Sequence, residues 1–224
     1  MEDSKKLFLL DAYALIYRGY YAFIKNPRIN SKGTDTSAIL GFMNSLLEII
    51  RTQNPDYLAV AFDKGGSITR SKMFTEYKSN RDKTPEPILV AIPYIKDILS
   101  AMKIPILEKE GYEADDVIGT VAKDAENNNF KVFMVTPDKD FAQLVSDNVF
   151  LCKPARMGNS MEIWGVSEVK EKFEVEDPEQ VIDYLGMMGD SVDNIPGLPG
   201  VGDKTAKKFL KQYGSLENLL KNSH

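Results

Sequence analysis

Three short apolar runs, each followed closely by an aspartate, constrain the fold of this sequence most. The runs are Leu7 to Leu10 before Asp11, Tyr57 to Phe62 before Asp63, and Val132 to Val135 before Thr136, Pro137 and Asp138. Each run has the length of a β-strand and is rich in β-branched or aromatic residues. We therefore predict three buried strands that all end at an acidic residue.

Two segments with helical spacing of apolar residues lie between these runs. The first is Ser37 to Ile50, and the second is Glu113 to Ala125. Apolar residues in both recur at intervals of three and four, which is typical of a helix with one buried face. Strands that alternate with helices predict an α/β fold with a mostly parallel central sheet covered by helices on both faces. At 224 residues, the chain is long enough for one such domain with a small appendage.

The counts of cysteine and histidine exclude several kinds of site. Cys152 is the only cysteine, which excludes an internal disulfide and a cysteine-based zinc site. The single histidine is the last residue, His224, which argues against histidine catalysis and histidine metal ligands. An enzyme of this composition would have to use carboxylates, lysines and metal ions.

Acidic residues gather where such a sheet would bind a ligand. In open parallel sheets, ligands bind beyond the carboxyl ends of the strands. Nine acids fall at predicted strand ends, at a helix start or in short motifs: Asp11, Asp63, Glu113, Asp115, Asp116, Asp138, Asp140, Asp190 and Asp193. Any one of them also fits a structural role, since acids are common at helix starts and in turns. Together they would repel one another without a cation.

The chemistry of these acids indicates which cation they would bind. Ligands with oxygen atoms alone suit Mg²⁺ or Mn²⁺ rather than zinc or copper. Two such ions can clamp a phosphoryl group during in-line displacement. The net charge of −5 becomes +4 when the nine acids are set aside, so the acidic balance does not exclude a nucleic-acid partner.

The segment from Lys64 to Pro87 is polar and lacks a sustained apolar period. It carries six basic residues against three acidic ones, with Phe74 and Tyr77 interleaved. A connection of this length is either functional or disordered. A solvated surface loop is the ordinary alternative for such a charge-rich stretch.

A glycine-rich segment near the end of the chain leads into an amphipathic helix. The sequence NIPGLPGVGDKTAKKFLKQYGS contains two Pro-Gly turns, and the helix would place Ala206, Phe209, Leu210 and Tyr213 on one side. Asp203 is the expected N-cap and Gly214 the expected C-cap. Pro-Gly turns often do no more than end an element, so this segment alone does not predict a function.

Six segments taken in order resemble the signature blocks of the 5′ nuclease family. They are FLLDAYALIYR, AVAFD, EYKSNR, GYEADDVIGT, TPDKDFAQLV and GMMGDSVDNIPGLPGVGDKTAKKFL. The resemblance is closest to the N-terminal 5′–3′ exonuclease domain of bacterial DNA polymerase I, a relative of the flap endonucleases. It implies a PIN-like, Rossmann-like nuclease core over 1–185 with a helical arch at about 64–90. A helix–three-turn–helix DNA-binding element would follow over 186–224.

The resemblance also implies a role for each matching residue. The first metal cluster would be Asp11, Asp63, Glu113, Asp115 and Asp116, and the second Asp138, Asp140, Asp190 and Asp193. The predicted catalytic residues are Lys78, Arg81, Asp116 and Asp138. The predicted DNA contacts are Tyr77, Lys78, Arg81, Gly200, Gly202, Lys204, Lys207 and Lys208. If YKSNR is helical, Lys78 and Arg81 are neighbours on one face and both reach the scissile phosphate.

The expected activity is divalent-metal-dependent 5′–3′ exonuclease and structure-specific 5′-flap endonuclease action, as in primer removal and repair. Two Mg²⁺ or Mn²⁺ ions would serve as cofactors, and the glycine-rich element would hold K⁺, as is frequent in the family. The partner would be flap, nicked or gapped DNA, not a membrane. We expect a cytoplasmic, nucleoid-associated bacterial monomer. The family's nuclease domain continues beyond this length, so we also expect a fragment of a longer protein with a covalently linked polymerase domain.

Three other functions fit parts of the sequence. A DNA-structure binder without catalysis would lack some of the carboxylates, and none of the nine is missing. A small RNA-directed nuclease on a similar acid-rich fold would lack YKSNR and the glycine-rich segment. A phosphatase of the Asp-x-Asp kind would carry that motif after the first strand, whereas Asp138 and Asp140 follow the third.

Overall fold

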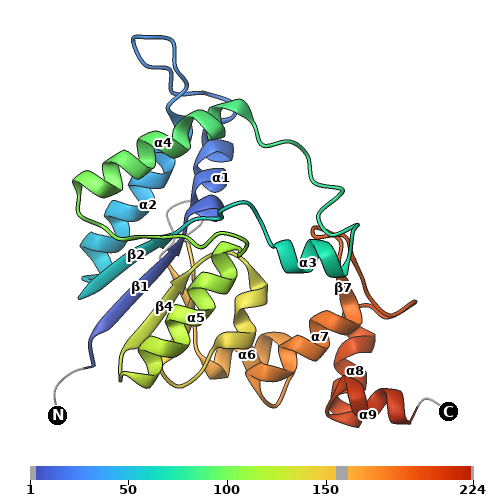
Figure 1. Cartoon of the computed structure of the whole chain (residues 1–224). Helices are drawn as coiled ribbons and strands as arrows, with labels where there is room; N and C mark the ends of the chain where they lie inside the picture. Colours follow the sequence, from blue (N-terminus) through green and yellow to red (C-terminus); the bar gives the residue numbers. More distant parts are fainter. Residues whose placement is uncertain (1–3, 155–160, 223–224) are drawn as a thin grey trace.

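A six-stranded sheet forms the centre of the computed structural model, which describes residues 4–154 and 161–222 and so leaves out His224. The strand order is β3-β2-β1-β4-β5-β6 (Figure 1). The strands are β1 Lys6–Asp11, β2 Tyr57–Ala61, β3 Ile106–Leu107, β4 Lys131–Val135, β5 Val149–Lys153 and β6 Glu162–Trp164. All neighbouring strands are parallel except β5 and β6, which confirms the mostly parallel sheet.

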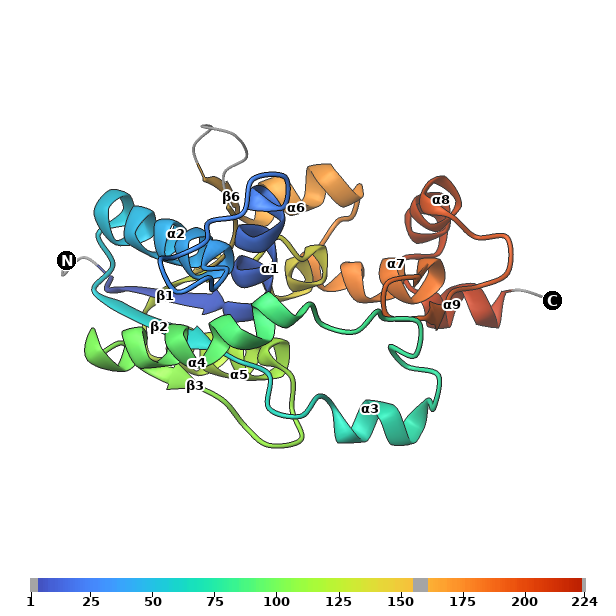
Figure 2. The same cartoon turned by 90° about the horizontal axis from the view of Figure 1, so that it is seen from above.

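Helices cover both faces of this sheet. The larger helices are α1 Ala12–Phe23, α2 Ser37–Gln53, α4 Glu86–Ala101, α5 Ala114–Asn127, α6 Val166–Phe173, α7 Val181–Met188 and α8 Asp203–Tyr213. Buried residues of α1, α2 and α4 form a core on one face, and those of α5, α6, α7 and α8 form a core on the other (Figure 2). The two-faced covering predicted from the sequence is confirmed.

The burial of β1 on both faces explains why its sequence reads as a continuous apolar run. Phe8 and Leu10 belong to the core with α1 and α2, whereas Leu9 belongs to the core with α5. All three side chains are almost fully buried. Alternating residues therefore fill opposite cores, and no polar face remains to interrupt the run.

The order of the strands creates a switch point beside β1. The chain continues from β1 to β2 and β3 on one side, and then returns to place β4 on the other side of β1. Crossover connections diverge at such a point and leave a crevice beyond the carboxyl ends of the two strands. Asp11 at the end of β1 and Thr136 just after β4 lie at this crevice.

Residues 64–85 extend from the sheet and return to it as an arch. Figure 1 shows this segment leaving β2, passing beside β7 and returning to α4. Its one helix is α3 Ile68–Met73, and residues 75–80 form turns. Lys78 has a φ of 57°, so YKSNR is not helical, and the helical spacing considered for Lys78 and Arg81 does not apply. The segment has no apolar face to bury, and its tip bonds to the turn at 190–194 instead.

The carboxyl-terminal part combines short helices with a small hairpin. The hairpin strands are β7 Gly189–Asp190 and β8 Ile195–Pro196, and α9 Leu216–Lys221 follows α8. Gly202, not Asp203, is the N-cap of α8, while Gly214 is its C-cap as predicted. The predicted boundary after residue 185 falls inside α7, and one core joins Met134 of β4 to Leu210 of α8. In the described parts of the chain, no helix is long and apolar enough to cross a membrane.

Candidate active site

Asp11 is the innermost carboxylate of the switch-point crevice. It ends β1 and caps α1, where its side chain accepts a hydrogen bond from the Ala14 amide at 3.1 Å. The hydroxyl of Thr136 donates to its other oxygen at 3.0 Å. Burial raises the pKa of Asp11 to about 6, and the charges of Asp63 and Asp138 act in the same direction. The first and third predicted strands thus bring their acids together.

The amino terminus of α5 brings three more acids to the same edge. Glu113 is the N-cap residue, and Asp115 and Asp116 occupy the first turn. The Ala114 amide, also in this turn, donates to Asp63 Oδ1 at 2.5 Å. That bond joins the end of β2 to α5. The positive end of the helix dipole favours the gathering of negative charge here.

Asp115 lies where the negative charges are most crowded. Burial raises its pKa to about 8, and the charges of Asp11, Asp138 and Asp63 add to the shift. A carboxyl group in this position is held partly protonated near neutral pH unless a cation compensates the charge. These four acids come from β1, α5 and the loops that follow β2 and β4.

Asp138 and Asp140 extend the acidic cluster toward the carboxyl-terminal hairpin. Asp138 is the N-cap of the 3₁₀-helix η1 Lys139–Leu144 and accepts from the Asp140 amide at 2.9 Å. Asp140 Oδ1 is buried and has no hydrogen-bond partner within the described structure. Burial raises the pKa of Asp140 to about 6, reinforced by Asp138 and Asp190. A buried oxygen in this state is suited to accept a cation.

Two glycines fix the hairpin that carries Asp190 and Asp193. Gly189 has a φ of 71°, and a Cβ there would lie 2.3 Å from the Gly197 amide nitrogen. A Cβ on Gly197 would lie equally close to the carbonyl carbon of Met188. Only glycine permits this approach, which explains the glycine on each side of the turn. The hairpin then places Asp193 against the arch and Asp190 near Asp140.

The arch places its polar residues directly on this acidic cluster. Lys78 Nζ lies 2.7 Å from Glu113 Oε1 and 3.6 Å from Asp193 Oδ2. The Tyr77 hydroxyl donates to both carboxylates, at 2.9 and 3.2 Å. Arg81 forms an ion pair with Asp193 Oδ1. Lys78 and Arg81 therefore meet at one acid, Asp193, through a turn and not along a helix.

Arg70 is a site residue that the sequence analysis did not single out. Its guanidinium binds both oxygens of Asp116, at 2.7 and 2.8 Å, and approaches Glu113 at 3.3 Å. These hydrogen bonds hold the pKa of Asp116 below its ordinary value. The only sequence signal was its place among the basic residues of the arch, which did not distinguish it from its neighbours.

A cavity of about 300 Å³ opens between the arch, α5 and η1. Asp115, Asp140 and Asp193 line it together with Tyr77 and Arg70. Across the described residues, no three acids converge closely enough to hold a metal ion as they stand. The predicted ligands are therefore gathered at one edge but not arranged as a coordination sphere, and arch cations bind Glu113, Asp116 and Asp193 in place of one.

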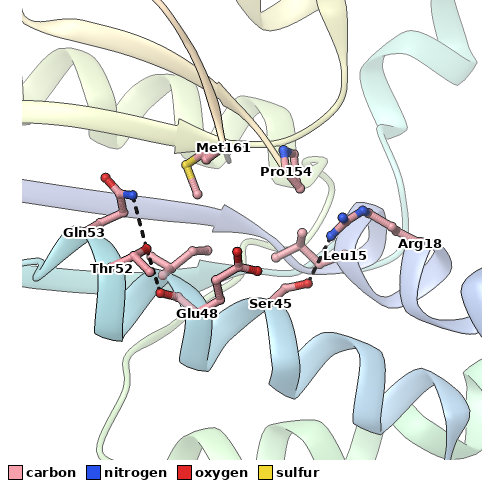
Figure 3. Close-up of a pocket in the computed structure, with 9 residues that line it drawn as sticks. Leu15, Arg18, Ser45, Glu48, Thr52, Gln53, Pro154 and Met161 are labelled. Atoms are coloured by element: carbon pink, nitrogen blue, oxygen red, sulfur yellow. Dashed lines mark hydrogen bonds between the residues drawn. The ribbon is translucent and has the colours of Figure 1, made fainter. Parts of the chain in front are cut away.

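A smaller cavity of about 140 Å³ lies between α1, α2 and the ends of the loop that joins β5 and β6. Figure 3 shows Arg18 beside Ser45, with Glu48 and Thr52 further along α2. Arg18 donates to the Ser45 hydroxyl at 3.2 Å. The residues that line this cavity include none of the predicted site residues, so the acidic edge is the better candidate.

The glycine-rich element forms a turn that leads into α8. Gly200 has a φ of 77° in the turn before α8, and the helix begins without a side-chain cap. Its first amides are therefore available to an anion. Lys204 and Lys208 are exposed, but Lys207 is ion-paired with Glu174 at 3.3 Å. Lys207 also pairs with Asp203 at 3.1 Å, which counts against its predicted contact with DNA.

The mostly parallel, helix-covered α/β sheet of this chain is the fold of several nucleases of known structure. T5 5′-exonuclease with bound zinc matches over 97% of this chain and 79% of its own, with a TM-score of 0.78 and 23% identity. The catalytic core of Rad2 in complex with DNA matches over 96% and 63%, with a TM-score of 0.64 and 20% identity. At these identities the likeness establishes the fold alone.

Sequence comparison identifies the family. The model of the 5′-3′ exonuclease N-terminal resolvase-like domain matches residues 6–174, and that of the 5′-3′ exonuclease C-terminal SAM fold matches residues 176–224. The chain belongs to the 5′-3′ exonuclease family. A 5′-3′ exonuclease of Aquifex aeolicus is 45% identical over 97% of this chain and 73% of its own length. DNA polymerase I of Bacillus subtilis is 43% identical over 98% of this chain but only 25% of its own length.

Proposed function

We propose that this chain is a divalent-metal-dependent nuclease that removes nucleotides from DNA 5′ ends and cuts 5′ flaps. The observation that carries this proposal is the meeting of acids and arch cations at the switch point. Glu113 binds Lys78 at 2.7 Å, and the same cluster continues through Asp115 to Asp11. Membership of the 5′-3′ exonuclease family supports the reaction class, and the geometry supports the choice of residues.

The acids fall into two groups that suit two ions. The first group is Asp11, Asp63, Glu113, Asp115 and Asp116, and the second is Asp138, Asp140, Asp190 and Asp193. Asp138 lies between the two, since its charge acts on both Asp115 and Asp140. The unpartnered buried oxygen of Asp140 and the strong repulsion at Asp115 both fit a donor set that lacks only its cation. Bound Mg²⁺ or Mn²⁺ would polarise the phosphate and lower the pKa of a bound water.

The arch residues would act on the phosphate itself. Lys78 and Arg81 already lie at the acidic edge, where the scissile phosphate must come to meet the metal site. A guanidinium and an ammonium group at this point stabilise charge that grows on the phosphate oxygens during attack. Tyr77, beside them, offers a ring on which the terminal base can stack.

The glycine-rich turn and α8 would bind the duplex part of the substrate at a distance from the scissile phosphate. Exposed Lys204 and Lys208 lie one helical turn apart, next to the uncapped amides of the first turn. Such a surface binds backbone phosphates without reading sequence. Carbonyl oxygens of the turn around Gly200 and Gly202 would hold K⁺. The natural setting that fits this chain best is a bacterial cytoplasm, where a linked polymerase domain would fill the gap that the nuclease opens.

Cleavage of a 5′-flap duplex, labelled at either end, tests the proposed function. We expect short 5′ products with Mg²⁺ or Mn²⁺ and none in excess chelator. Asp138→Ala should abolish cutting while leaving DNA bound, and Asp124→Ala, an exposed acid on α5, serves as the matched control. Full activity in chelator would refute the metal mechanism. Binding of flap DNA without cleavage under any metal would identify a DNA-structure binder instead.

A further inference from the structure

The acids of the site differ in the side chains that surround them. Both oxygens of Glu113 are bonded to arch side chains, through Lys78 on one and Tyr77 and Arg70 on the other. Asp193 is held in the same way by Arg81, Tyr77 and Lys78. Asp115, in contrast, has other carboxylates as its main electrostatic neighbours. The arch therefore bonds directly to one part of the cluster and leaves the other part without a bonded cation.

Neutral hydrogen bonds hold the arch tip in this place. The Asn194 amide donates to the carbonyl of Glu76 at 2.8 Å and to the Ser79 hydroxyl at 3.1 Å. The Asn80 amide donates in the opposite direction across the contact, to the Ser191 carbonyl at 2.7 Å. These bonds between residues 76–80 and 191–194 are called the arch latch below. Asn80 is exposed, Asn194 is half-buried, and neither bears a charge.

The backbone of the arch tip also depends on the latch. The Lys78 amide donates to the Asp193 carbonyl at 2.9 Å. Lys78 has a φ of 57°, a left-handed conformation that costs free energy for a residue with a Cβ. Contacts from the surrounding structure must maintain that conformation. The docked tip is thus an arrangement that can be lost when its partners at 191–194 are taken by another ligand.

We propose that the arch latch opposes metal binding: Asn80 and Asn194 hold the arch cations on the acidic cluster until a divalent ion displaces them. The inference rests on the proposed metal-dependent function. A carboxylate oxygen that accepts from an ammonium or guanidinium group has fewer lone pairs for a metal. A divalent ion also repels Lys78 and Arg81 directly. The displaced cations are then free to meet the substrate phosphate.

Thermodynamic linkage makes the proposal quantitative. If metal binding weakens docking of the arch, docking weakens metal binding by the same factor. Asn80 and Asn194 are accordingly positioning residues, which act through Lys78 and Arg81 without touching the metal. Replacing one of them should weaken the docking of the arch and raise the affinity of the site for the metal ion. An asparagine with a purely structural role would not change metal affinity.

Limited proteolysis of the full chain without DNA tests whether a divalent ion releases the arch. Trypsin cleavage after Lys78 and Arg81 should rise roughly fivefold or more in Mg²⁺, compared with NaCl of equal ionic strength, if the coupling is in the usual range. Asn194→Ala should show fast cleavage without metal. Asn128→Ala removes a comparable exposed amide bond, to the Asp124 carbonyl at 2.8 Å, and should behave like wild type.

Mn²⁺ titration of the same proteins tests whether the arch latch lowers the affinity for the metal ion. Asn194→Ala and Asn80→Ala should each bind Mn²⁺ more tightly, by roughly fivefold or more. Cleavage by trypsin that is equal in Mg²⁺ and NaCl would overturn the proposal, as would unchanged Mn²⁺ affinity in both variants. Failure of every protein to bind Mn²⁺ would instead reject the metal-dependent function from which the latch proposal starts.

Discussion

The hydroxyl of Thr136 donates to the buried carboxylate of Asp11 at 3.0 Å and so joins the ends of β4 and β1 across the switch point. The Thr136 side chain is fully buried, and its hydroxyl also accepts from the Asp138 amide at 3.2 Å. One side chain therefore fixes the innermost acid and the start of the loop that bears the next one. Asp11 needs this donor because burial disfavours its charged form.

Thr136→Val should lower cleavage activity, although the valine side chain has nearly the same shape as threonine. The hydrogen bond from Thr136 lowers the pKa of Asp11, so its loss should raise that pKa above about 6. Asp11 would then be more protonated at neutral pH, and cleavage near pH 7 should fall by about 10-fold or more, the effect of losing one donor that orients a ligand. Part of the loss should return at higher pH. A flap-cleavage profile from pH 6 to 9 checks this, and a uniform loss across that range would contradict it.

Asp115→Asn should stabilise the protein in a chelator, and more so as the pH rises. The pKa of Asp115 is about 8 in the folded chain and 3.8 in the reference state, so the folded state holds the extra proton between these values. Stability of the wild type must then fall as the pH rises through that window. We expect the variant to melt at least about 4 °C higher than wild type at pH 8, the shift for about 1–2 kcal/mol in a chain of this size.

The difference between Asp115→Asn and wild type should shrink toward pH 5. Thermal melts in chelator at both pH values measure it, with Asp124→Asn on the exposed face of the same helix as the control. If the melting temperatures of Asp115→Asn and wild type differ equally at pH 5 and pH 8, the carboxyl is not crowded in the way the structure indicates. Added Mg²⁺ should reverse the order of stability, since the ion binds only the folded wild-type cluster strongly.

Lys78→Ala and Arg81→Ala should each slow single-turnover cleavage by roughly 100-fold or more, the scale of losing one positioned electrostatic donor. Both side chains reach Asp193, so the double variant should cost less than the product of the two single effects. Affinity for flap DNA should change far less. Saturating enzyme and Mg²⁺ isolate the chemical step. Rate constants within about threefold of wild type, far short of that donor scale, would leave the arch as a solvated basic loop.

Lys204 and Lys208 should account for salt-dependent binding of the duplex, whereas Lys207 should not. Replacing Lys204 and Lys208 together with alanine should flatten the dependence of affinity on salt by up to about two units of slope. Lys207→Ala breaks ion pairs with Glu174 and Asp203 and should lower the melting temperature without changing that slope. Titrations of an uncut duplex in chelator at several salt concentrations distinguish the residues. An equal effect at all three positions would refute the assignment.

Much of the fold followed from local patterns in the sequence. The strands at Asp11, Asp63 and Asp138 were predictable because central parallel strands are buried on both faces and read as apolar runs. Strand β3 was missed because it has only two residues, Ile106–Leu107, and its pairing with β2 depends on tertiary contact. The chain around Lys78 is not helical, since no residue of 75–81 belongs to either core.

The sequence by itself determined which acids meet, since a parallel sheet sends the ends of its strands to one edge whatever the details of packing. Only the tertiary structure decided what those acids touch. Arg70 on Asp116, Thr136 on Asp11 and Asn194 on the arch tip join residues between 46 and 125 positions apart along the chain. Contacts over such separations leave no periodic trace in a sequence, because each depends on the path of a whole loop.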